Sequence, residues 1–218
     1  DEHVKRIVKT DLTTLADKYG DERRTSIEAV SGEVDIEDLI PEETCVFTLT
    51  HEGYIKRTTL DTYQAQNRGG RGVQGMTQKD EDFTEEMYVG STHDYMLFLT
   101  NQGRVYRLKG YQVPEGSRTA KGSHIVNLLQ LQEGEKVTLM LQQKADVDED
   151  NTYATMVTKQ GLIKRTPLSQ FRNIRKAGLI AIALNEGDSL VWSHLTKGDD
   201  EIIVATHDGA AIHFTEDG

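Results

Sequence analysis

One short pattern recurs four times along the chain and limits the folds that it can adopt. Each copy has apolar residues, a Thr-x-x-Gly turn and further apolar residues, and the turn glycines are Gly53, Gly103, Gly161 and Gly209. They are separated by 50, 58 and 48 residues. Glycine adopts positive φ angles without steric cost, so it can close a hairpin at the fourth position of such a turn. The pattern therefore predicts a β-hairpin at the start of each repeat.

Two further blocks follow the hairpins at regular distances. The first block ends at Gly72, Gly122 and Gly178, which lie 19, 19 and 17 residues after the hairpin glycine. The second block, around Gly134 and Gly187, separates two apolar stretches in the second and third repeats. About four strands in a repeat of roughly 50 residues are typical of propeller blades. We expect a mainly β, propeller-like pinwheel of four-stranded blades, three full and a partial fourth.

The N-terminal stretch has a different pattern. Its apolar residues recur at helical spacing, and Gly20 is suited to follow the end of a helix. We therefore expect a short helix and linker over residues 1–25 and the β-pinwheel over residues 26–218. The apolar stripe of this helix requires a partner. Its residues are Val4, Ile7, Val8, Leu12, Leu15 and Tyr19.

Charge is distributed unevenly along the chain. The formal net charge is −11, from 36 acidic and 25 basic residues. Yet residues 46–79, 103–124 and 159–178 together contain 16 of the 25 Lys and Arg and only three of the 36 Asp and Glu. Because a polyanion responds to the local field, these windows predict a basic track on an otherwise acidic molecule. The alternative is that basic and acidic loops neutralise each other.

One run in the first repeat combines bare backbone with cations. It consists of Gln66, Asn67, Arg68, Gly69, Gly70, Arg71 and Gly72. Guanidinium groups and the N–H groups of a glycine-rich loop both bind phosphate oxygens. Its register relative to the hairpin is that of Arg118 to Gly122 in the second repeat, so we predict an ordered loop on the rim of the first blade. Gly69 and Gly70 would allow a phosphate chain to approach the backbone closely.

Other residues point away from catalysis and metal binding. Cys45, the single cysteine, lies in an apolar stretch and is expected to be buried, and Trp192 is expected to lie in the core. The seven histidines have no metal-binding spacing, and no P-loop is present. A membrane span needs about 20 consecutive apolar residues, and no run in this sequence approaches that length. No signal peptide is recognisable either, so we expect a cytoplasmic protein.

Several stretches together resemble the A subunit of bacterial DNA gyrase. They are Tyr19–Thr25, Leu49–Arg57, Gln66–Met76, Ser91–Asp94 and Lys109–Gly122. The resemblance covers essentially the whole chain. It implies that residues 1–25 end the coiled-coil arm of the breakage–reunion core, and that the rest is the C-terminal DNA-wrapping β-pinwheel. The run from Gln66 to Gly72 resembles the gyrase A box, Gln-Arg-Arg-Gly-Gly-Lys-Gly, from which Asn67 and Arg71 depart.

The resemblance implies a function and a set of partners. The domain would bind and wrap double-stranded DNA without sequence specificity, so that the parent type IIA topoisomerase introduces negative supercoils. The implied protein partners are the B subunit of gyrase and a second A subunit. ATP and Mg²⁺ would belong to the holoenzyme, and no cofactor, metal site or catalytic residue is expected within this chain. The strand-cleaving tyrosine would lie upstream, and no membrane partner is implied.

A wrapped duplex needs a row of phosphate contacts, which Arg and Lys supply without reading bases. Beyond the box, the candidates for this track are Lys56, Arg57, Arg104, Arg107, Arg118, Lys121, Lys164, Arg165, Arg172, Arg175 and Lys176. For each of them the alternative is an ordinary solvated surface cation. Two other interpretations of the chain remain open, namely the equivalent domain of topoisomerase IV, which decatenates DNA, and a protein-interaction propeller.

Overall fold

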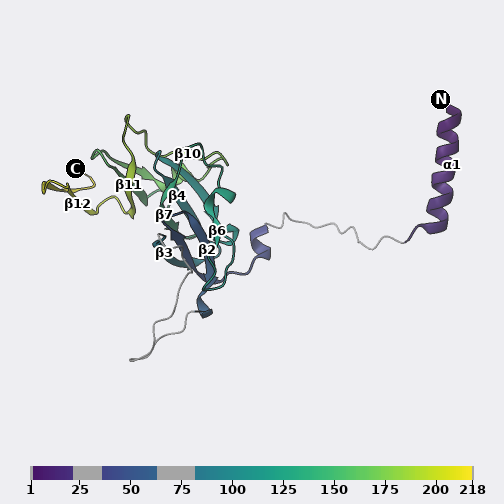
Figure 1. The fold of residues 1–218 in the computed structure, drawn as a ribbon, viewed down its shortest axis with the longest axis horizontal. Coiled ribbons are helices and arrows are strands. Elements are labelled where there is room, and N and C mark those ends of the chain that lie inside the picture. Colours follow the sequence, from purple (N-terminus) through teal and green to yellow (C-terminus); the bar gives the residue numbers. More distant parts are fainter. Residues whose placement is uncertain (1, 22–35, 63–81, 218) are drawn as a thin grey trace. The chain divides into compact units, whose positions relative to one another are not determined.

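The computed structural model describes residues 2–21, 36–62 and 82–217, and its two units are described separately (Figure 1). The first unit, Asp1–Asp38, contains helix α1 (Glu2–Tyr19). All side chains described in α1 are exposed, including the predicted apolar stripe. The N–H group of Gly20 donates to the carbonyl oxygen of Ala16 at 2.7 Å, directly after the helix ends. The expected helix is therefore confirmed, while the predicted domain boundary at residue 25 lies outside the described residues.

The second unit, Leu39–Gly218, consists of antiparallel sheets. The first sheet has the order β3 (Thr84–Ser91), β1 (Thr44–Thr50), β2 (Tyr54–Thr59), β6 (Ser123–His124). The second has the order β10 (Leu179–Ile180), β5 (Arg104–Lys109), β4 (Tyr95–Thr100), β7 (Val137–Gln143). The third has the order β11 (Leu190–Thr196), β8 (Tyr153–Thr158), β9 (Ile163–Pro167), and β12 (Glu201–Ala205) pairs with β13 (Ala211–Thr215). The 3₁₀ turns are η1 (Ile36–Leu39), η2 (Leu60–Thr62), η3 (Gly110–Gln112), η4 (Ile125–Asn127) and η5 (Leu168–Phe171).

The hairpins predicted from the repeat are all present. They are β1–β2, β4–β5, β8–β9 and β12–β13. The turn glycines have positive φ angles, from +74° at Gly103 to +86° at Gly161. The expected mainly β pinwheel is confirmed, and within the described residues its third sheet has three strands and its fourth has two.

The sequence repeat and the sheet do not coincide. Strand β6 comes from the second repeat but pairs with β2 of the first, opposing His124 to Tyr54. Strand β10 comes from the third repeat and pairs with β5 of the second, opposing Ile180 to Arg104. The first two sheets are therefore each completed by a strand that the next repeat donates. This donation brings residues of successive repeats, 70 positions apart for Tyr54 and His124 and 76 apart for Arg104 and Ile180, into contact at each seam.

The core lies between successive sheets. Met96, Phe98 and Met140 of the second sheet pack in a cluster with Phe47 and Ile55 of the first. The alternate residues Leu97, Leu99 and Leu141 pack in a second cluster with Met156 and Leu190 of the third sheet. The second sheet is thus apolar on both faces, as expected for an internal layer of a stack. In the part of the chain that the structure describes, no helix is long and apolar enough to cross a membrane.

The structure confirms one expectation about buried residues and corrects another. Cys45 is fully buried in β1, as predicted. Trp192 is 42% exposed, so the prediction of a core position was wrong. The pairing of β11 with β8 shifts register between Leu190 and Trp192, after which Ser193 is buried and both Trp192 and His194 are exposed. An apolar run in the sequence does not show this shift.

Candidate nucleic-acid interface

The candidate interface consists of two equivalent loops that precede the donated strands. The first rim loop comprises residues 113–122 and precedes β6, and the second comprises residues 171–178 and precedes β10. The predicted contacts Gln66, Asn67, Arg68, Gly69, Gly70, Arg71 and Gly72 lie outside the described residues. By sequence register that run is the counterpart of these loops in the first repeat. The other eleven candidate cations divide into side chains that face inward and side chains that are exposed or half-buried on the surface.

Lys56 was predicted to contact phosphate, but the structure places it inside. Its side chain is fully buried, with 1% of the residue exposed. Its ammonium donates to the carbonyl oxygens of Ser117 at 3.1 Å, Arg118 at 2.5 Å and Ala120 at 3.0 Å. Burial, and to a smaller extent the charge of Arg118, lowers the pKa of Lys56. The prediction that Lys56 contacts phosphate is therefore wrong, because the first rim loop covers the amine and its carbonyl oxygens accept hydrogen bonds from all three N–H donors.

Arg57, the next residue of β2, also supports the first rim loop. Its Nε donates to the carbonyl oxygen of Val113 at 2.9 Å, and its Nη2 lies 3.3 Å from a carboxylate oxygen of Glu115. The backbone N–H and C=O of Arg57 bond to Pro114 and Gly116 of the same loop. Most of the hydrogen-bonding capacity of Arg57 is thus used within the protein.

Arg107 has the equivalent role one repeat later. Its Nη1 donates to the carbonyl oxygens of Phe171 at 3.2 Å and Arg172 at 3.0 Å, in the second rim loop. Its Nη2 lies 3.2 Å from a carboxylate oxygen of Glu149, and its guanidinium carbon lies 3.4 Å from the ring centre of Tyr95. Burial lowers the pKa of Arg107, and the neighbouring tyrosine and carboxylate oppose this shift. Arg107, like Arg57, therefore bonds the rim loop that the next repeat donates.

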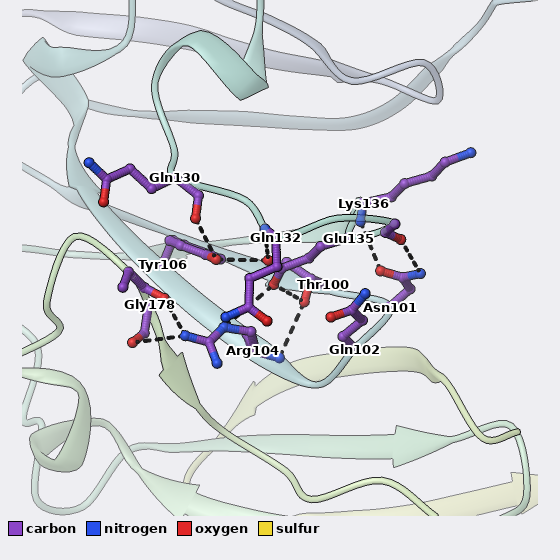
Figure 2. Close-up of polar contacts among 12 residues, drawn as sticks. Thr100, Asn101, Gln102, Arg104, Tyr106, Gln130, Gln132, Glu135, Lys136 and Gly178 are labelled. Atoms are coloured by element: carbon purple, nitrogen blue, oxygen red, sulfur yellow. Dashed lines mark hydrogen bonds and ion pairs between the residues drawn. The ribbon is translucent and has the colours of Figure 1, made fainter. Parts of the chain in front are cut away.

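Arg104 contacts the end of the second rim loop. Its Nη2 donates to the carbonyl oxygens of Ala177 and, at 3.4 Å, of Gly178, as Figure 2 shows for Gly178. Its Nε lies 3.8 Å from a carboxylate oxygen of Glu135, whose side chain is fully buried. Glu135 accepts hydrogen bonds from the hydroxyls of Thr100 and Tyr106, both at 2.8 Å. A buried carboxylate thus lies on one side of Arg104 and the rim loop on the other.

The remaining candidates lie on the rim loops and on β9, and their side chains are exposed or half-buried. Arg175 and Lys176 are exposed on the second rim loop, and Arg118 is half-buried on the first. Lys121 is also half-buried, with its ammonium 3.8 Å from the ring centre of Tyr54. These cations remain accessible to a polyanion from the solvent side.

Three further exposed candidates have partners within the protein. On β9, Lys164 donates to the carbonyl oxygen of Ala181 at 2.6 Å and Arg165 to that of Gly198 at 3.1 Å. Arg172 on the second rim loop forms ion pairs with Glu149 and, at 3.6 Å, with Asp150. Its hydrogen bond to Glu149 raises the pKa of Arg172. Acidic residues therefore neutralise part of the second rim loop, as the alternative interpretation of the charge pattern anticipated.

The sequence analysis missed two acidic residues that hydrogen-bond at the hairpin turns around Gly103 and Gly161. Glu135 follows Gly134, and Asp188 follows Gly187, so both belong to a repeated Gly-acid pair. Glu135 accepts a bond from Thr100, and Asp188 accepts bonds from the backbone N–H groups of Gln160 and Ser189. Their position after a repeated glycine was a signal that could have identified them. Among the described residues no group of three or more His, Cys, Asp and Glu is arranged to hold a metal ion.

Comparison with known proteins identifies matching domains. The family model described as DNA gyrase C-terminal domain, beta-propeller, matches residues 46–89, 94–144 and 153–197. The A subunit of DNA gyrase from Clostridium acetobutylicum is 52% identical over 210 residues, which are 96% of this chain and 25% of that protein. The A subunit of DNA gyrase from Halalkalibacterium halodurans is 48% identical over 215 residues, 99% of this chain and 26% of that protein. The chain therefore spans about a quarter of the length of these curated relatives.

Solved structures agree with this match. The C-terminal domain of DNA topoisomerase IV has a TM-score of 0.67 and 31% identity, covering 81% of this chain and 53% of that one. A DNA gyrase A C-terminal domain has a TM-score of 0.61 and 28% identity, covering 79% and 55%. The structural comparison therefore includes both topoisomerases, whereas the family model and the two curated relatives are those of gyrase.

Proposed function

We propose, because this chain belongs to the family of DNA gyrase C-terminal domains, that its β-pinwheel binds duplex DNA without sequence specificity and wraps it along the rim loops. The observation that carries the proposal is the repetition of accessible cations on equivalent loops of adjacent sheets. Arg118 and Lys121 lie on the first rim loop, and Arg175 and Lys176 lie on the second. Phosphate contacts from such side chains fix the path of a duplex without reading its bases.

The arrangement meets the physical demands of wrapping. Bending DNA over lengths well below its persistence length of about 150 base pairs costs several kcal/mol, which a series of charge contacts must offset. A loop that recurs once per repeat would supply such contacts at intervals along the path of the duplex. The box at residues 66–72 would extend this track in the first repeat by its sequence register.

Membership of this family supports a proposal for the role in the whole enzyme. We infer that the wrap directs an ATP-dependent introduction of negative supercoils by a complex with the B subunit of gyrase and with a second copy of the parent chain. This complex would act on the chromosome in the cytoplasm. ATP and Mg²⁺ would act in other parts of that complex. This chain would set the path and the curvature of the DNA, and its own residues would not take part in strand cleavage.

The test is a DNA titration of the purified protein over a range of salt concentrations, using duplexes of unrelated sequence. Each phosphate contact contributes about 0.9 to the slope of log affinity against log salt. Replacing Arg175 and Lys176 by Ala should therefore reduce the slope by about 1.8. The matched control is Lys144→Ala, which removes an exposed cation next to the acidic run 146–150 and should leave the slope unchanged. Undetectable binding at low salt would contradict the proposal and favour a protein-interaction propeller.

Wrapping is measured separately, by ligating nicked circular DNA with the protein bound and reading the change in linking number. We expect positive writhe, reduced by the double substitution of Arg68 and Arg71 by Ala. The match to the C-terminal domain of DNA topoisomerase IV gives a second candidate, a domain that would bind DNA with little wrapping. Salt-dependent binding without a change in linking number would favour that candidate. Normal wrapping by the double variant would show that the box is not the principal wrapping element.

A further inference from the structure

We propose that Lys56 and Arg104 are positioning residues, each of which fixes from the preceding repeat the rim loop that presents the cations of the next repeat. The inference rests on the proposed DNA binding, which gives the rim loops their function. Lys56 belongs to the first repeat and binds the loop that carries Arg118 and Lys121. Arg104 belongs to the second repeat and binds the loop that carries Arg175 and Lys176.

The contacts of Lys56 define the backbone of the first rim loop. An ammonium has three N–H donors, and the carbonyl oxygens of Ser117, Arg118 and Ala120 use all three. The N–H of Ala120 also donates to the carbonyl of Ser117 at 3.0 Å, which closes a turn around the amine. The loop returns to β2 at Gly122, where a Cβ would lie 2.5 Å from the carbonyl oxygen of Ile55. Lys56 therefore holds the turn from its interior, and the close approach of Gly122 to β2 holds the end of the loop.

The second seam uses the same two strand positions with the residue types exchanged. Tyr54 and Lys56 are the first and third residues after Gly53, and Arg104 and Tyr106 are the first and third after Gly103. In the first repeat the third position supplies the cation for the loop carbonyls, whereas in the second repeat the first position does. Each seam thus has one cation and one tyrosine beneath the rim loop.

The tyrosines also contact the loops. The ring of Tyr54 lies under the ammonium of Lys121, 3.8 Å from its centre. The ring of Tyr106 lies against Gly178, where a Cβ would approach ring carbons to 2.8 Å. Two different sequences therefore produce the same arrangement, an inward cation on loop carbonyls and an aromatic ring against the loop. This recurrence indicates a requirement for a fixed loop rather than a chance contact of one lysine.

The arrangement has an electrostatic consequence for a polyanion. Carbonyl oxygens carry partial negative charge and would oppose a phosphate approaching the same loop. In both rim loops a cation from the preceding repeat bonds these oxygens from inside. The cations of each loop are then presented by a backbone in which these carbonyl oxygens already accept hydrogen bonds. Because the supporting residue belongs to another repeat, the position of each cation depends on the packing of adjacent sheets.

The experiment crosses the two supporting residues with the two loops. Lys56→Met and Arg104→Met are each combined with two loop variants, the double Ala substitution of Arg118 and Lys121 and the double Ala substitution of Arg175 and Lys176. Amide hydrogen exchange is measured without DNA, and the salt dependence of DNA binding is measured with duplexes of unrelated sequence. A general loss of stability would affect both loops equally, so the pairing of support and loop is the decisive readout.

We expect Lys56→Met to speed exchange in residues 116–122 by about tenfold or more and to leave residues 175–178 unchanged. We also expect it to weaken DNA binding about threefold to tenfold, and to make the further loss from the Arg118 and Lys121 substitutions smaller than in the unaltered protein. The Arg175 and Lys176 substitutions should keep their full effect. Arg104→Met should show the reverse pattern.

Unchanged exchange in the loop paired with each supporting residue, together with additive effects on binding, would overturn the inference while leaving the proposed function intact. Absence of DNA binding by the unaltered protein would instead contradict the proposed function, and the exchange measurements would still decide whether the two residues fix the loops. If Lys56→Met does not fold, Arg104→Met decides the question, because it removes a side chain that is partly exposed at the seam.

Discussion

The guanidinium of Arg107 lies 3.2 Å from the carboxylate of Glu149, and this ion pair joins strand β5 to the segment between β7 and β8. The Arg107 side chain is only 9% exposed. Glu149 also bonds Arg172 of the second rim loop and the side-chain amide of Gln143. One carboxylate therefore connects the second sheet, the linking segment and the rim loop of the third repeat.

Glu149→Gln should destabilise the protein by about 1–3 kcal/mol, because it leaves a largely buried guanidinium without its carboxylate. Urea unfolding measures the loss. The matched control is Asp150→Asn, which affects an exposed pair with Arg172 at 3.6 Å and should change stability by less than about 0.5 kcal/mol. If Glu149→Gln costs no more than its control, the loop carbonyls alone satisfy Arg107.

Gly178→Ala should cost more than Gly187→Ala, although the two glycines have nearly equal φ angles of +74° and +73°. At Gly187 an added Cβ meets no atom within 4 Å, so only the backbone penalty of about 1 kcal/mol applies. At Gly178 the Cβ would lie 2.8 Å from ring carbons of Tyr106, and we expect a further 1–3 kcal/mol, roughly the cost of overpacking. Equal losses in thermal or urea unfolding would show that the Tyr106 ring moves aside without cost.

The sequence predicted the hairpins well because glycine marks each turn locally. The φ angles of Gly53 and Gly161, +84° and +86°, are those that the Thr-x-x-Gly pattern requires. The exchange of strands between repeats was not predictable in the same way. The donated strands Ser123–His124 and Leu179–Ile180 are two residues long, too short to show any periodicity. Their pairing depends on contacts between repeats, which local patterns do not encode.

The candidate site was predicted less well, because the count of cations in a window does not reveal their exposure. Lys56 and Lys176 both lie in basic windows, yet the first is buried and the second is exposed. In β2 the neighbouring Ile55 is buried, so strand alternation places Lys56 on the opposite face of the strand. In an isolated hairpin that face would be exposed to solvent. The first rim loop, donated by the next repeat, covers that second face.

Cys45 should be inert toward thiol reagents in the folded protein. Its side chain is fully buried, and burial raises the pKa of the thiol, although a contact with Arg57 at 3.9 Å partly opposes this shift. We expect labelling by a disulfide reagent to be undetectable without denaturant and complete in urea, with free cysteine as the control for the reagent. Rapid labelling under native conditions would mean that the β1–β2 region opens far more often than the rest of the fold.

Glu216 should make the attachment of the final hairpin dependent on pH. Its partial burial raises the pKa of the carboxyl group, but hydrogen bonds from the hydroxyls of Thr196 and Thr155 and from the N–H groups of Gly198 and Asp200 outweigh this effect and lower it below the ordinary 4.5. When folding lowers the pKa of a carboxyl group, the group stabilises the folded state. This stabilisation is fully present at pH values above the pKa of the group in the unfolded chain. That stabilisation is lost as the pH falls through the pKa of the group in the folded protein.

The Glu216→Gln variant should therefore be less stable than the unaltered protein at pH 7, and the difference should shrink as the pH falls below about 4.5. The free energy of unfolding of both proteins, measured from neutral pH to about pH 3, tests this. Glu201→Gln is the control, since it alters an exposed carboxylate of the same sheet that contacts His213 at 3.3 Å. A difference between Glu216→Gln and the unaltered protein that stayed constant with pH would show that the amide loses packing rather than charge. In that case the four hydrogen bonds to Glu216 would not favour the ionised form.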